Sequence, residues 1–86
     1  MSAERLIGTW VAVGFPSFAY NFTSVDEGYY SMAGAKKEFK YNADDTTVDI
    51  YYPGDVSALH FKYQINQDVL SIEDSFGNLI DYKKKQ

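Results

Sequence analysis

The chain has 86 residues and a mass of 9.8 kDa, too little for two self-sufficient cores, so we expect one domain over residues 1–86. Its 8 basic and 12 acidic side chains give a net charge of -4, which argues against holding nucleic acid on a basic face and against docking to an anionic membrane. The lack of cysteine excludes a disulfide scaffold, a thiol nucleophile and a Cys-ligated metal. The unusual feature is an excess of aromatic residues, with 8 Tyr, 6 Phe and 1 Trp.

The hydropathy pattern is typical of strands. Apolar and polar residues alternate with a period of two, and no window keeps helical spacing for even three turns. Groups of turn-forming residues interrupt the alternation at regular intervals, from 14–17 to 75–78. No apolar run approaches the roughly 18 residues of a membrane span, so we expect no membrane insertion. Taken in chain order, the pattern predicts strands at 7–13, 18–23, 28–33, 37–42, 47–52, 58–65, 69–74 and 79–84.

An internal repeat groups these strands into hairpins. The segments Phe39–Asn42 (FKYN) and Phe61–Gln64 (FKYQ) lie 22 residues apart, and a similar segment, FAYN, begins at Phe18. Each opens a strand that is followed by a turn and a second strand, so three hairpins are flanked by two single strands. Such a meander leaves two exposed edges unless its last strand pairs with its first. We therefore expect an all-β, eight-stranded antiparallel up-and-down meander barrel.

Several short motifs add a family resemblance to this pattern. Gly8-Thr9-Trp10 opens the first strand, Gly28-Tyr29-Tyr30 lies in the third, and Leu70–Asp74 (LSIED) forms the seventh. Together with the repeated Phe-x-Tyr segments, they resemble the short lipocalin-like (calycin-type) domains of bacteria. The resemblance implies a miniature lipocalin-like barrel in an extracellular or cell-surface protein, and it implies no settled activity. The chain departs from the family at turn positions that are commonly Gly, where longer or less tight turns are expected: Val25, Asp45 and Gln67.

The alternation also predicts what fills the barrel. About 20 side chains point inward, and eleven of them are aromatic, so a packed aromatic core is favoured over a deep pocket. The hydroxyls of Tyr20, Tyr41 and Tyr63 are expected to reach a barrel end or backbone groups there. The predicted inward residues are Trp10, Ala12, Phe18, Tyr20, Phe22, Tyr30, Met32, Phe39, Tyr41, Val48, Ile50, Tyr52, Leu59, Phe61, Tyr63, Ile65, Leu70, Ile72, Ile80 and Tyr82.

The two barrel ends differ in charge and polarity. By the resemblance, Trp10 marks the closed end, where both termini meet three turns that carry acidic residues. Neutralisation by Arg5 and Lys83–Lys85 explains this cluster better than a Ca²⁺ site, because Asp44-Asp45 lacks the spacing of a calcium-binding loop. On the outer wall, Lys40 is expected to neighbour Asp49, and Lys62 to neighbour Glu73. We expect no metal and no cofactor. The acidic residues of the closed-end turns are Asp26, Glu27, Asp44, Asp45 and Asp68.

The open end carries the candidate binding site. Its loops, at 14–17, 33–37, 53–57 and 75–78, place apolar side chains at their tips and Lys36 and Lys37 on the rim. Apolar tips on a rigid scaffold have no evident duty in folding, and binding commonly occurs on such loops. The alternative is that Phe15 and Phe76 fold inward as a plug. The predicted ligand-binding residues are Phe15, Phe18, Met32, Tyr52 and Phe76.

Residues suited to catalysis are scarce. The single histidine, His60, falls on the outer face between two inward residues, and the carboxylates lie on outer faces and loop tips. We therefore expect no enzyme, but a binding module that takes a small apolar ligand, a peptide or a protein surface at its open end. The alternative is a solid structural or interaction domain of a larger secreted or surface-anchored protein, including one that self-associates.

Overall fold

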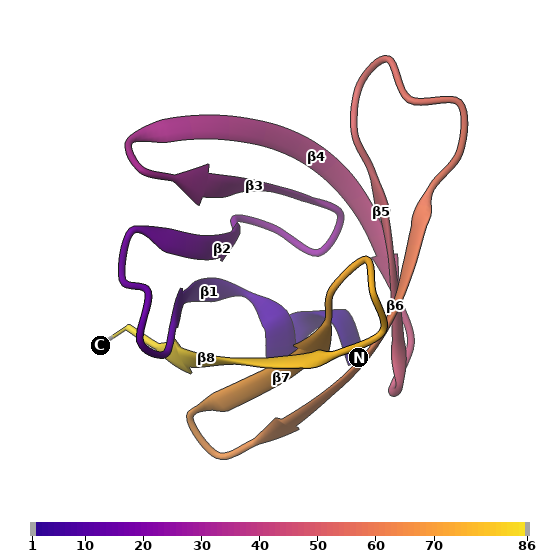
Figure 1. Cartoon of the computed structure of the whole chain (residues 1–86). Helices are drawn as coiled ribbons and strands as arrows, with labels where there is room; N and C mark the ends of the chain where they lie inside the picture. Colours follow the sequence, from indigo (N-terminus) through magenta and orange to yellow (C-terminus); the bar gives the residue numbers. More distant parts are fainter. Residues whose placement is uncertain (1, 86) are drawn as a thin grey trace.

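The computed structural model describes residues 2–85 and confirms the predicted barrel. Eight antiparallel strands follow one another in chain order around a closed barrel (Figure 1). Each strand begins and ends within two residues of its predicted bounds. The elements are a short 3₁₀ helix η1 (Ser2–Leu6), which the period-two pattern did not predict, and β1 (Gly8–Ala12), β2 (Phe18–Phe22), β3 (Glu27–Met32), β4 (Ala35–Ala43), β5 (Thr47–Tyr51), β6 (Leu59–Asn66), β7 (Val69–Glu73) and β8 (Leu79–Lys84).

Pairing between the first and last strands closes the barrel. In the β1–β8 ladder, Trp10 lies opposite Lys84 and Ala12 lies opposite Tyr82. Closure removes the unpaired edges that an open meander would expose. The longest connection, residues 52–58 between β5 and β6, extends away from the barrel wall (Figure 1).

The interior is a packed aromatic core. Of the 20 side chains predicted to point inward, 19 are buried or pack against the buried cluster. The exception is Met32, which is 41% exposed because it ends β3 at the open rim. The Tyr20 ring stacks on Phe22 at a centroid distance of 5.5 Å and meets Tyr30 and Tyr82 edge-on at 4.7 Å and 5.0 Å. Offset and edge-on contacts of this kind are the favoured geometries of aromatic pairs.

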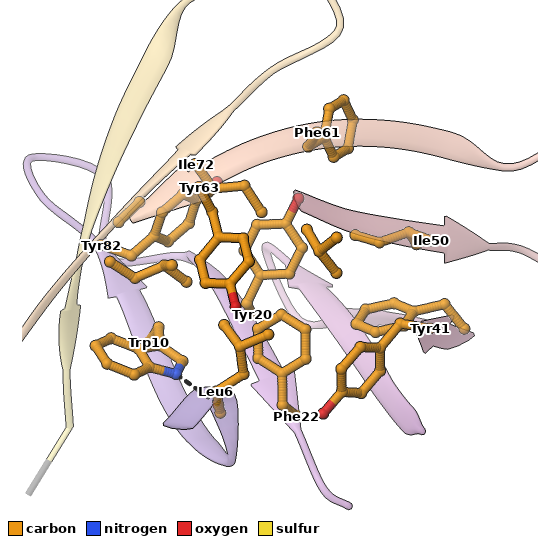
Figure 2. Close-up of a cluster of buried hydrophobic side chains, with 14 residues drawn as sticks. Leu6, Trp10, Tyr20, Phe22, Tyr41, Ile50, Phe61, Tyr63, Ile72 and Tyr82 are labelled. Atoms are coloured by element: carbon orange, nitrogen blue, oxygen red, sulfur yellow. Dashed lines mark hydrogen bonds between the residues drawn. The ribbon is translucent and has the colours of Figure 1, made fainter. Parts of the chain in front are cut away.

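Helix η1 covers the closed end of the barrel. Leu6, its last residue, is fully buried, and its carbonyl accepts a hydrogen bond of 2.8 Å from the Trp10 indole nitrogen (Figure 2). The hydroxyls of Tyr41 and Tyr63 donate to the carbonyls of Ser24 and Asp44 in the nearby turns, as predicted for these two tyrosines. Leu6 was not predicted to be a core residue, because it precedes the first alternating strand.

Two connections are tighter than predicted. The β3–β4 turn comprises only residues 33 and 34, and Ala33 has a φ of 49° beside Gly34 at 91°. Gln67 likewise has a φ of 56° in the two-residue β6–β7 turn. Positive φ at the turn residues matches the right-handed twist of hairpin strands. The expected loosening at Gln67 is therefore wrong, because Gln67 itself takes the left-handed conformation.

The outer wall carries polar cross-strand contacts. Lys40 lies opposite Tyr51, and Asp49 opposite Asn42, so the predicted Lys40–Asp49 pair is not formed by directly opposed residues. Glu73 does contact Lys62, but its carboxylate accepts the backbone N–H of Lys62 at 2.7 Å. These contacts hold neighbouring strands together on the outer wall.

Candidate functional site

A pocket of about 260 Å³ lies at the open end of the barrel. We call it the mouth pocket. Its lining comes from the inner faces of β2, β3, β4, β6 and β8, from the end of β7, and from the first residues after β5 and β7. It is lined by Tyr20, Tyr30, Met32, Lys37, Tyr52, Leu59, Phe61, Glu73, Asp74, Ser75, Ile80 and Tyr82.

Four tyrosines line this pocket: Tyr20, Tyr30, Tyr52 and Tyr82. The hydroxyls of Tyr30 and Tyr82 are hydrogen-bonded to each other at 3.0 Å. Within residues 2–85, the hydroxyls of Tyr20 and Tyr52 have no protein partner, and no fully buried side-chain oxygen is left without one. Because Tyr20 is otherwise buried, its hydroxyl must be accessible from the pocket. The prediction that Tyr20 reaches a barrel end therefore applies to the open end, without a backbone partner.

Burial raises the pKa of three of these hydroxyls, those of Tyr20, Tyr52 and Tyr82. Desolvation, with smaller contributions from Tyr52 and Tyr30, raises the pKa of Tyr20 well above its usual value. Desolvation also raises the pKa of Tyr52 to about 12, and together with the hydrogen bond between Tyr82 and Tyr30 it raises the pKa of Tyr82 strongly. Each group is therefore neutral at physiological pH and able to donate a hydrogen bond.

The walls of the mouth pocket are apolar. Met32 stands at the end of β3, Leu59 and Phe61 lie on the inner face of β6, and Ile80 lies on β8. Leu59 and Ile80 pack against the core cluster, so these walls are continuous with the barrel interior. The pocket thus combines this hydrophobic surface with the polar side chains of its other lining residues, and small-molecule sites usually contain both.

Charged residues lie on two sides of the rim. Lys37 lies opposite Tyr30 on the inner face of β4, and its ammonium nitrogen is 4.4 Å from the centroid of the Tyr52 ring. Glu73 and Asp74, three strands away, use one oxygen each to accept backbone N–H groups. Glu73 accepts that of Lys62, and Asp74 accepts those of residues 76 and 78 at 2.8 Å and 3.0 Å. These carboxylates therefore help to hold the rim in shape.

The predicted site residues are only partly brought together. Met32 and Tyr52 line the mouth pocket, whereas Phe15, Phe18 and Phe76 are not among its lining residues. Phe18 packs against the core, with its ring centroid 6.4 Å from that of Phe15. Phe15 and Phe76 are 62% and 88% exposed, so they do not fold inward as a plug.

Sequence reasoning did not assign the other tyrosines or Lys37 to the site. Tyr20, Tyr30 and Tyr82 were predicted to point inward, but only as core residues. Lys37 was predicted to lie on a loop rim. The alternation in Lys37–Tyr41 contains the missing signal, because it puts Lys37 on the same face as the buried Phe39 and Tyr41.

Other groups of polar residues have structural explanations. His60 lies on the outer wall as predicted, with its Nδ1 atom 2.6 Å from an Asp49 oxygen, and both side chains are accessible to solvent. Asp44 accepts the backbone N–H groups of Thr46 and Thr47, and these bonds lower the pKa of its carboxyl. Within the described residues, no group of three or more His, Cys, Asp or Glu is placed to hold a metal ion. Nor does that part of the chain contain a helix long and apolar enough to cross a membrane.

No protein-family model matches this chain, and no curated protein or solved structure is significantly similar to it. The resemblance to lipocalin-like domains therefore depends on the short motifs and on the barrel itself. A function has to be argued from the chemistry of the mouth pocket.

Proposed function

We propose that this protein is a non-enzymatic binding module that takes a small, largely apolar molecule into the mouth pocket. The observation that carries the proposal is a pocket of about 260 Å³ with apolar walls and two tyrosine hydroxyls, of Tyr20 and Tyr52, that have no protein partner within residues 2–85. Ligand pockets usually measure about 300–1,000 Å³, and this pocket lies just below that range, so only a small ligand would fit.

The walls and the hydroxyls have separate roles in this proposal. Covering Met32, Leu59 and Phe61 with an apolar ligand body removes hydrophobic surface from water, which stabilises the complex by about 25 cal/mol for each Å² covered. The hydroxyls of Tyr20 and Tyr52 give orientation, because a ligand that leaves them unpaired loses their hydrogen bonds with water. A purely apolar molecule is therefore a poorer ligand than one with a polar end.

We also propose the finer fold assignment, a miniature lipocalin-like barrel in an extracellular or cell-surface bacterial protein. The closed eight-stranded meander and the Gly8-Thr9-Trp10 opening support it. Trp10 lies at the closed end, where it bonds to Leu6, so the opposite end is the one open for binding.

Fluorescence of the dye ANS, which increases in an apolar environment, tests whether the mouth pocket binds. We expect native protein to enhance ANS fluorescence, and we expect Met32→Trp to abolish the enhancement by filling the mouth. Val25→Trp is the matched control, because Val25 is comparably exposed at 48% but lies in a turn at the closed end. It should leave the enhancement unchanged.

Three results would contradict the proposal. Native protein that does not enhance ANS fluorescence has no usable pocket. Enhancement that persists in Met32→Trp, with the barrel intact by circular dichroism, places the dye elsewhere on the surface. Loss in both tryptophan variants would also count against the mouth, because Val25 is remote from it.

A second candidate function is self-association through the loop tips of the open end. Phe76, Val56 and Phe15 are exposed there, and Val56 is fully so. Exposed apolar side chains gathered at one end mark interaction surfaces more often than isolated ones do. Analytical ultracentrifugation of the native chain and of Phe76→Ser tests this alternative, which requires a native dimer that the substitution weakens. A monomer at all concentrations rules it out.

A further inference from the structure

Among residues 2–85, Lys37 is the only basic residue in the lining of the mouth pocket. Its place in the register, opposite Tyr30, puts it on the inner face of β4, and its ammonium nitrogen lies over the Tyr52 ring at 4.4 Å. The neighbouring Lys36 makes a similar contact at 4.5 Å, but with Tyr29 on the outer wall. The two lysines thus have matched surroundings on opposite faces of one strand.

The polar groups around Lys37 supply hydrogen-bond donors. The Tyr20 and Tyr52 hydroxyls have no protein acceptor within residues 2–85, and the Tyr30–Tyr82 pair uses only one of its two protons. Tyrosine hydroxyls are protonated at neutral pH, and burial raises the pKa of Tyr20 and Tyr52 further above the ordinary value of 10.0. A cation and three available hydroxyl protons together favour an oxyanion as their partner.

The acidic rim limits which anion can bind. Asp74 lies at the pocket rim on the side away from Lys37, and one oxygen of its carboxylate accepts two backbone N–H groups, whereas the Glu73 carboxylate is held on the outer wall by the Lys62 N–H. A second negative charge on the ligand would be repelled on that side. Lys37 already occupies the face of the Tyr52 ring, where a ligand cation would otherwise bind.

We propose that the mouth pocket selects small organic monocarboxylates, with the carboxylate held by the Lys37 ammonium and the Tyr20 and Tyr52 hydroxyls. This inference rests on the proposed function, because it names the ligand class for the same pocket. The apolar body of the ligand lies against Met32, Leu59 and Phe61. Charge-assisted hydrogen bonds are about twice as strong as neutral ones, so the acid should bind more tightly than its neutral analogue.

Three probes that share the same apolar group but differ in charge distinguish the effect of ligand charge from that of ligand shape. They are hydrocinnamate, its neutral amide and the cation phenylpropylamine. Amide NMR titrations of native protein should give an affinity for hydrocinnamate about tenfold higher than for its amide, as expected for hydrogen bonds to a charged group. Lys37→Met should remove this preference. Lys36→Met changes the net charge equally but should retain it. Lys37→Gln repeats the test with a polar side chain, should Lys37→Met fail to fold.

A matched pair of variants, one test and one control, examines the role of the Tyr52 hydroxyl. Tyr52→Phe removes a hydroxyl that faces the pocket, and Tyr51→Phe removes one from the half-exposed neighbour on the outer wall. We expect an affinity for hydrocinnamate about tenfold lower in Tyr52→Phe, and no change in Tyr51→Phe. Equal losses in both variants would contradict a role for the Tyr52 hydroxyl.

The same titrations distinguish failure of this inference from failure of the proposed function. If native protein binds the amide or the amine as tightly as the acid, the inferred preference for carboxylates is wrong. The proposal that the mouth pocket binds small molecules still stands. If none of the three probes shifts the amides around the mouth pocket at millimolar concentration, both are wrong. An acid preference that survives in Lys37→Met and Lys37→Gln also overturns the assignment to Lys37.

Discussion

Gly28 lies in β3 between Phe22 on one neighbouring strand and Phe39 on the other. A Cβ atom there would lie 2.4 Å from the carbonyl oxygen of Asn21 and 3.0 Å from the Phe39 ring. The first contact is with backbone, so β2 and β3 would have to move apart. We expect Gly28→Ala to lower the free energy of unfolding by about 3 kcal/mol, measured by urea denaturation.

Gly14→Ala is the control for this prediction. Gly14 has a φ of 84°, but a Cβ atom there would have no neighbour within 4 Å. Its substitution should cost only the strain of a left-handed alanine, about 1 kcal/mol. Equal costs at the two glycines would mean that small shifts relieve the close contacts at Gly28, and that lack of space does not constrain it.

Ala33 is a second residue whose side chain is poorly suited to its backbone conformation, because it has a φ of 49° in the β3–β4 turn. Asparagine tolerates this conformation better than alanine does, and Asn-Gly is the preferred pair for such a turn. We expect Ala33→Asn, which creates that pair with Gly34, to raise the midpoint of urea unfolding, with a gain of about 0.5–1 kcal/mol. Ala35→Asn, at the first position of β4, should give no gain.

At the scale of elements, η1 acts as the lid of the closed end. Leu6 is fully buried, whereas the adjacent Ile7 is 37% exposed. We expect Leu6→Ala to cost about 2–5 kcal/mol in chemical denaturation, because it leaves a cavity under the helix. Ile7→Ala removes a similar apolar group from a half-exposed position and should cost much less. Similar costs for both would mean that the helix does not seal the core.

The strands could be predicted from the sequence, and η1 and the register could not. Alternation assigns a residue to a face, so segments such as Lys37–Tyr41 were placed correctly as strands. A helix of five residues shows no repeat, so the burial of Leu6 was missed. Alternation also does not say which residues face each other across strands, because turn lengths set the register. Lys40 and Asp49 were for this reason matched wrongly.

For the whole molecule, the tyrosine hydroxyls at the two barrel ends differ in their hydrogen bonding. At the closed end, the hydroxyls of Tyr41 and Tyr63 are bonded to turn carbonyls. At the open end, those of Tyr20 and Tyr52 face the mouth pocket. Sequence reasoning placed the candidate site at the end where the mouth pocket lies, but it favoured apolar loop tips such as Phe76. Which hydroxyls lack a partner depends on the closed structure, so the polar part of the site could not be read from the pattern.

The buried tyrosines also predict how the barrel responds to alkali. Desolvation, the largest cause in each case, raises the pKa of Tyr20 and Tyr82 strongly and that of Tyr41 and Tyr52 to about 12, from an ordinary value of 10.0. A folded-state pKa above the unfolded value means that unfolding releases protons in this range. The stabilisation is therefore complete below about pH 10 and is lost as the pH rises toward the folded-state values.

We accordingly expect the barrel to unfold cooperatively above about pH 10, with tyrosinate absorbance and loss of the circular dichroism signal changing together. Tyr20→Phe removes one of the most strongly shifted groups and should make stability fall less steeply with pH over this range. Tyr51→Phe, on the half-exposed outer wall, should leave that slope unchanged. If the tyrosines all titrate near pH 10 while the circular dichroism signal persists, the hydroxyls of the core are open to solvent. The conclusion that the closed end excludes water while the open end admits it would then be wrong.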